Sequence, residues 1–177
     1  GPFSHTGLKA DIALSEDFSL MLGVFNDTDL TEFNPTGDYY FGGYSDNKGM
    51  VARVTPEGEV VWMKTIDFGP DPDYLMNLRL TSDNFIIGCG NARTGGADND
   101  YGFVFKIDLS GTVLWKRKFV CDDLYLWANA VTESSNGNYR AIGSFKNTRQ
   151  DNYVIEYDAA TGAVVWDSIY AKTAIDN

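Results

Sequence analysis

The chain has 177 residues, of which 44% are hydrophobic and 14% aromatic, and this composition excludes an intrinsically disordered tail. It carries 14 Lys and Arg against 25 Asp and Glu, and the formal net charge of -11 argues against nucleic acid and anionic lipid as partners. We interpret the acidity as a solubilising surface, with cation binding by acidic loops as the alternative. No run reaches the roughly 18 to 20 apolar residues of a membrane-spanning helix, so membrane insertion is not expected.

The amino-terminal part of the chain divides into a leader and an incomplete repeat. Residues 1–9 are the predicted leader, and their Gly1-Pro2 start is typical of a protease-cleavage scar or a mature terminus. Residues 12–23 resemble residues 78–88, where two strand-like runs are joined by a turn. We therefore predict a partial blade of two strands at residues 10–27.

A longer repeat follows. Gly, three further residues and Trp occur three times, and successive Trp residues are 53 and 51 positions apart. A strand-like run ending in Gly precedes each copy, at residues 39–43, 85–88 and 139–143. Two landmarks recurring in the same order indicate three repeats, which we place at residues 28–72, 73–122 and 123–177.

Each repeat contains four short runs rich in β-branched and aromatic residues, separated by Gly, Asp, Asn and Ser, which are typical of β-hairpins. The one segment with a competing helical pattern is residues 124–130. Its alternation and its place in the repeat favour a strand there as well.

A sheet of four strands cannot bury both of its faces alone, but stacked sheets can, as in a β-propeller. The sequence therefore predicts an all-β fold of propeller blades, each of four antiparallel strands. Two strands and three sets of four give about three and a half blades, a partial propeller or one half of an assembled ring. Three interpretations remain open: a fragment whose longer chain completes the ring, a homodimer, or a strand pair that caps an open ring.

The segment 157–166, which reads Tyr-Asp-Ala-Ala-Thr-Gly-Ala-Val-Val-Trp, resembles the tryptophan-docking motif of quinoprotein-type propellers. Residues 98–108 are also similar to bacterial repeats of the seven-bladed type, which are found in secreted or surface proteins. The resemblance implies that successive blades dock through Trp, and that the docking residues are Gly58, Trp62, Gly111, Trp115, Asp158, Thr161, Gly162 and Trp166. We expect the Gly before each Trp to adopt positive φ in a tight turn. The adjacent cysteines of the quinoprotein dehydrogenases are missing, so their activity is not expected here.

Few residues in the chain suggest chemistry. His5 is the only histidine, which removes histidine-based triads and metal sites. Cys89 and Cys121 are interpreted as ordinary core or edge residues, with a mutual disulfide as the alternative. No cofactor is expected, although calcium is compatible with acidic loops, whose weak candidate ligands are Asp71, Asp73, Asp98 and Asp100. Solvated turns are the alternative interpretation of these loops.

The sequence therefore predicts a noncatalytic binding or structural module that contacts protein or glycan at a cell surface or outside the cell. An enzyme with a carboxylate-based site on the propeller axis, such as a glycan hydrolase or lyase, is the first alternative. A self-assembling structural subunit is the second.

Overall fold

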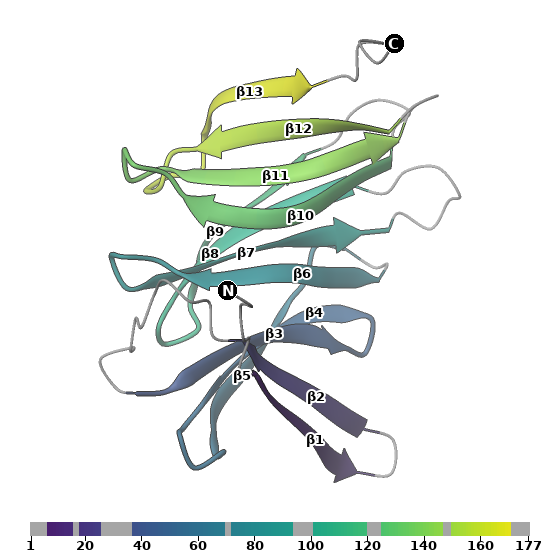
Figure 1. The fold of residues 1–177 in the computed structure, drawn as a ribbon, viewed down its shortest axis with the longest axis vertical. Coiled ribbons are helices and arrows are strands. Elements are labelled where there is room, and N and C mark those ends of the chain that lie inside the picture. The colour runs from purple at the N-terminus through teal and green to yellow at the C-terminus, as the bar shows by residue number, and fades with distance from the viewer. Residues whose placement is uncertain are drawn as a thin grey trace, which may run out of the picture. The chain divides into compact units, whose positions relative to one another are not determined.

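The computed structural model describes residues 7–15, 18–25, 37–69, 72–93, 101–119, 125–146 and 150–170. In these residues the chain is all-β, with antiparallel strands and no helix, as predicted (Figure 1). No described helix is available to cross a membrane. The strands are β1 (Gly7–Ser15), β2 (Phe18–Phe25), β3 (Tyr39–Ser45), β4 (Lys48–Val54), β5 (Val60–Ile66), β6 (Asp73–Leu80), β7 (Phe85–Ala92), β8 (Tyr101–Asp108), β9 (Val113–Phe119), β10 (Tyr125–Glu133), β11 (Tyr139–Lys146), β12 (Gln150–Tyr157) and β13 (Val164–Tyr170).

The chain divides into two compact units, Gly1–Tyr39 and Tyr40–Asn177. In the first unit, β1 and β2 form an antiparallel pair with an irregularity between Ala13 and Ser15. β1 begins at Gly7, so the last three residues of the predicted leader belong to a strand. The two strands expected within the partial blade are thus one hairpin.

The second unit consists of three antiparallel sheets, β3-β4-β5, β6-β7-β8-β9 and β10-β11-β12-β13, in which consecutive strands are neighbours. We call them the first, second and third sheet, and each lies inside one predicted repeat. Four strands are expected in the repeat at residues 28–72, and the first of them, at residues 29–33, lies outside the described residues. The segment with the competing helical pattern is largely in β10, so the prediction of a strand there is confirmed.

The core lies between the sheets because the second sheet is covered on both faces. Alternate residues of β8 point to opposite sides: Phe103 and Phe105 pack toward the first sheet, and Val104 packs toward the third. All three are fully buried. This burial explains why the sequence of β8 is an almost continuous apolar run. A strand with one solvent-exposed face would instead alternate apolar and polar residues.

The turn before each predicted docking Trp has the expected backbone. Gly58, Gly111 and Gly162 adopt φ of 91°, 84° and 68°, which confirms the predicted positive φ. The turns join β4 to β5, β8 to β9 and β12 to β13, so each places its Trp on the last strand of a sheet.

Candidate functional site

The first and second sheets meet through Trp62. Its indole Nε1 donates a hydrogen bond of 3.0 Å to the carbonyl of Leu109, in the turn between β8 and β9. A Cβ added to Gly111 in the same turn would lie 3.2 Å from the indole ring. Arg53, directly opposite Trp62 in the β4–β5 register, also directs its guanidinium to the Leu109 carbonyl, at 3.4 Å.

The second and third sheets meet in the same way through Trp115. Its Nε1 donates to the carbonyl of Ala159, at 3.2 Å, in the turn between β12 and β13. A Cβ on Gly162 would lie 2.6 Å from the ring, so glycine is required there for close approach as well as for φ. Lys106, opposite Trp115 in the β8–β9 register, donates to the same carbonyl at 3.1 Å. The same three groups thus make both contacts between sheets: an indole, the side chain of an arginine or lysine opposite it, and a turn that contains glycine.

The accepting turn of the third sheet is held by Asp158. The backbone N and Oγ1 of Thr161 both donate to Asp158 Oδ1, at 2.8 and 2.7 Å. These hydrogen bonds lower the pKa of Asp158 below its ordinary value. Arg117 reaches the turn from β9, where its Nε donates to the Gly162 carbonyl at 2.9 Å. The structure therefore brings Trp115, Asp158, Thr161 and Gly162 together.

The third predicted Trp has different surroundings. Trp166 is half-buried on β13, and the guanidinium of Arg140 lies over its ring, 5.5 Å from the centroid. No hydrogen bond of its indole N–H is formed with another described residue. The residue opposite Trp166 is Glu156, which occupies the register position that Arg53 and Lys106 occupy in the other two sheets.

Glu156 is fully buried and accepts hydrogen bonds from three side chains. Oε1 accepts from Asn136 and Asn138 at 2.8 and 2.9 Å, and Oε2 accepts from Arg140 Nε at 2.7 Å. The donors stabilise the ionised carboxylate and lower its pKa from 4.5 to about 2. The sequence analysis missed this residue, although a glutamate inside the apolar run of β12 was a visible signal.

A lowered folded-state pKa means that Glu156 favours folding above the ordinary glutamate pKa and loses this effect as pH falls through about 2. We expect Glu156→Gln to flatten the decline in unfolding free energy between pH 4.5 and 2, as measured by urea denaturation at several pH values. Asn138→Ala, which removes one of the three donors, should give an intermediate slope. If the unfolding free energy of Glu156→Gln declines between pH 4.5 and 2 as steeply as that of the native chain, the Glu156 carboxylate does not contribute to the decline.

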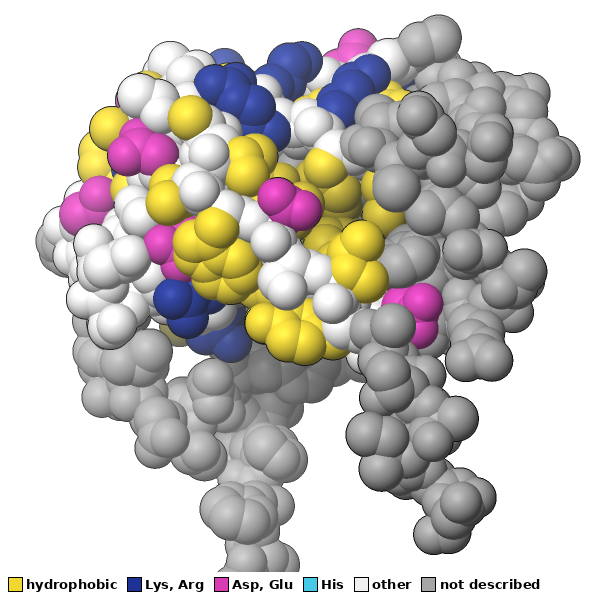
Figure 2. All heavy atoms as spheres, turned by 90° about the horizontal axis from the view of Figure 1, so that it is seen from above, with side chains coloured by type: hydrophobic (Ala, Val, Ile, Leu, Met, Phe, Trp, Pro, Cys, Tyr) yellow, Lys and Arg dark blue, Asp and Glu magenta, His cyan; other side chains and the backbone are white. Residues whose placement is uncertain are grey.

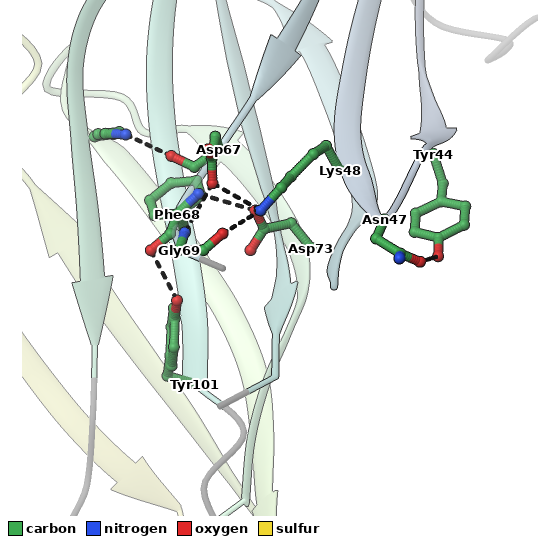
Figure 3. Close-up of polar contacts among 9 residues, drawn as sticks. Tyr44, Asn47, Lys48, Asp67, Phe68, Gly69, Asp73 and Tyr101 are labelled. Carbon is green, nitrogen blue, oxygen red and sulfur yellow. Dashed lines mark hydrogen bonds and ion pairs between the residues drawn. The ribbon is translucent and has the colours of Figure 1, made fainter. Parts of the chain in front are cut away.

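A second polar cluster, which we call the Lys48 junction, lies where the first two sheets meet (Figure 3). The ammonium of Lys48 contacts Asp67 Oδ1 at 2.9 Å and the Gly69 carbonyl, and lies 3.8 Å from Asp73 Oδ2. The Tyr101 hydroxyl donates to the Phe68 carbonyl at 3.0 Å. The ammonium thus lies beside two carboxylates and a carbonyl, oxygen atoms of the kind that a metal cation binds.

The two acids of the Lys48 junction, Asp67 and Asp73, have pKa values that are shifted in opposite directions. The hydrogen bond from Lys48 lowers the pKa of the exposed Asp67, whereas burial raises the pKa of Asp73. Asp73 Oδ2 accepts the Phe68 amide at 2.9 Å, while its Oδ1 is buried without a hydrogen-bond partner in the described part of the chain. Asp73 is fully buried, so substrate does not reach it in this conformation.

Of the four weak calcium candidates, Asp73 alone is described, and its neighbour is the Lys48 ammonium. Asp71, Asp98 and Asp100 lie outside the described residues. Among the residues described, no three of His, Cys, Asp and Glu gather as a metal site. Calcium binding therefore stays a prediction.

Cys89 is a free, fully buried thiol in the core between the second and third sheets. Burial raises its pKa to about 12, so it is inert near neutral pH. Cys121 lies outside the described residues.

The exposed Tyr44 stacks on Tyr74 with ring centroids 5.0 Å apart, and this stacking occupies one face of each ring.

The fold thus defines a protein of stacked antiparallel sheets with repeated indole contacts. No protein-family model matches the chain, and no curated protein matches it.

Proposed function

We propose that the chain is a noncatalytic β-propeller module of about three and a half blades that binds another protein through the outer face of its third sheet. In this proposal the three sheets of the second unit are successive blades. Its support is the repeated contact in which Trp62 and Trp115 dock on the glycine turn of the next sheet. The sequence resemblance makes a cell-surface or extracellular setting part of the proposal.

The observation that carries the proposal is the outer face of the third sheet. Ile142 and Val154 are neighbours in register, and Trp166 lies in the next row. Ile142 is 42% exposed, whereas Cys89, which occupies its position in the second sheet, is fully covered. Apolar side chains gather on the face seen from above the third sheet, with Lys and Arg near its rim (Figure 2). An exposed apolar face with a polar rim is typical of a protein interface.

Protein is favoured over glycan because this face combines aliphatic side chains with an Arg–Glu pair. The guanidinium of Arg140 covers one side of the Trp166 ring, which leaves less of the indole for a sugar to stack on. A glycan ligand is therefore an outcome that the test below must distinguish.

The enzyme alternative requires ionisable carboxylates that a substrate reaches. Asp73 and Glu156 are both buried and engaged, the first by Lys48 and the Phe68 amide and the second by three donors. Their arrangement is that of structural pairs, which supports a noncatalytic role for these two carboxylates.

The dye 1-anilinonaphthalene-8-sulfonate, whose emission rises on exposed apolar surface, tests whether the outer face is open. At submicromolar protein concentration we expect saturable binding to the native chain. Ile142→Glu should reduce the emission more than twofold with an unchanged circular dichroism spectrum. The control is Val113→Glu, which changes an apolar residue of similar exposure on the last strand of the second sheet and should leave most of the emission.

Equal emission from the native chain and the Ile142→Glu variant would contradict the proposed binding face. A titration with neutral and acidic oligosaccharides, followed by tryptophan fluorescence, separates the two ligand classes. Saturable binding of a sugar that Ile142→Glu abolishes would replace protein by glycan as the ligand.

A further inference from the structure

Among the described residues, the repeated contact leaves one indole and one turn unused. Trp62 docks on the turn at residues 108–112 and Trp115 docks on the turn at residues 158–163. Trp166 and the turn at residues 55–59 are the remaining members of the series. Residues 1–39 contain no Trp, so the first unit has no indole with which to fill that turn.

The unused turn has the same backbone as one that already holds an indole. Thr55 N donates to the Glu59 carbonyl at 2.9 Å and Gly58 N donates to the Thr55 carbonyl at 3.0 Å. The corresponding bonds in the turn that receives Trp62, from Asp108 N and Gly111 N, are both 3.0 Å. By this correspondence, the carbonyl of Pro56 takes the place of the Leu109 carbonyl, the acceptor for Trp62.

Gly58, the glycine of the unused turn, has more open surroundings than the glycines of the two occupied turns. Gly111 and Gly162, which face Trp62 and Trp115, are buried, whereas Gly58 is exposed. A Cβ added to Gly58 would have nothing within 4 Å. Space for an indole is therefore present beside this glycine.

Charge complementarity indicates what fills the space. The positions of Ser110 and Thr112 in the occupied turn are taken by Glu57 and Glu59 in the unused one, and both glutamates are exposed. Beside Trp166 lies Arg140, whose Nε is already bonded to Glu156 and whose side chain is 41% exposed. An acidic turn and an indole with an adjacent arginine are complementary, and one chain carries both at opposite ends of the series of sheets.

We propose that Trp166 of one chain docks on the turn at residues 55–59 of a second copy, with its indole N–H donating to the Pro56 carbonyl and Arg140 lying near Glu57 and Glu59. This inference rests on the proposed function, since it names a second copy as a protein that binds at the Trp166 edge of the outer face of the third sheet. The β4 residues Met50, Ala52 and Val54 behind the turn are already buried, so the contact is confined to the turn and the sheet rim. The contact is heterologous, and copies therefore add head to tail until a ring closes or a filament grows.

Sedimentation velocity from low to several hundred micromolar protein tests self-docking. We expect the mass of the native chain to rise with concentration above the 19.6 kDa of a single chain. Trp166→Ala and the double variant Glu57→Lys/Glu59→Lys should both stay at the single-chain mass. The control is Val165→Ala, which changes the exposed neighbour of Trp166 on β13 and should assemble as the native chain does.

Mixing the two defective chains gives the sharper result. The Trp166→Ala chain keeps the acidic turn, and the double variant keeps the indole, so one working contact forms between them. The mixture should therefore reach the mass of two chains and no more, because neither end of that pair can add a further copy.

A native chain that stays at the single-chain mass throughout, or a Trp166→Ala chain that assembles as the native chain does, would overturn self-docking. These results are separate from the dye measurement. A single-chain native protein whose dye binding depends on Ile142 refutes the second copy as partner and leaves the open face as a site for a different protein.

Discussion

Replacing Trp115 by alanine is expected to lower the free energy of unfolding by about 3 to 5 kcal/mol, as for other fully packed Trp or Phe side chains. The side chain is 6% exposed, and its ring packs against the rings of Tyr139 and Tyr157 with centroids 6.1 and 6.2 Å away. Its loss also leaves the Ala159 carbonyl without the indole donor. Urea denaturation followed by circular dichroism measures the change.

The matched control for this variant is Trp166→Ala, because the two Trp residues occupy the same position in neighbouring sheets. Trp166 has no next sheet within the described chain, so its loss should cost less than about 1 kcal/mol when single chains are compared at low concentration. The difference between the two variants reports the contribution of sheet-to-sheet docking. Equal losses would mean that the indole stabilises its own sheet and that docking contributes little.

The strands were predictable because their signals are local. In β7 and β8, apolar runs bounded by Asn, Asp and Ser turns predict the elements without any knowledge of their neighbours. The glycine turns were equally predictable, since the motif of Gly, three residues and Trp places a tight turn before the last strand. Local spacing therefore accounts for the secondary structure and for the positive φ of the glycines.

The partners of the polar side chains were not predictable because they depend on long-range register. Trp62 finds its acceptor at Leu109, on the next sheet. Glu156 is neutralised by Arg140 only because β11 and β12 pair in a register that sets the two side by side. A shift by one residue would have placed the carboxylate on the opposite face of the sheet.

The partner of Asp73, a candidate calcium ligand, was not predictable for the same reason. The spacing of its acidic loop is compatible with a calcium ligand, but spacing does not reveal which cation a distant strand brings. In the fold, the start of β4 places the Lys48 ammonium 3.8 Å from Asp73 Oδ2. Its Oδ1 remains without a hydrogen-bond partner among the described residues, at full burial.

Replacing Gly162 by alanine is expected to lower the free energy of unfolding by about 2 to 5 kcal/mol, through two separable effects. A side chain at φ of 68° is strained, which costs about 1 to 2 kcal/mol. The new Cβ would also meet the Trp115 ring at 2.6 Å, so the indole must move away from the turn on which it docks. That overpacking adds about 1 to 3 kcal/mol.

Gly137→Ala separates the two effects. Gly137 has φ of 83°, but a Cβ there would have nothing within 4 Å, so this variant should show the backbone cost alone. Urea denaturation of both variants gives the comparison, and tryptophan emission reports whether the Trp115 environment changes. We expect Gly162→Ala to be the more destabilised of the two and to shift the emission, whereas Gly137→Ala leaves the emission as it is. Equal destabilisation with unchanged emission in both variants would show that the turn tolerates a methyl group beneath the indole, and the close approach between these sheets would then have no energetic consequence.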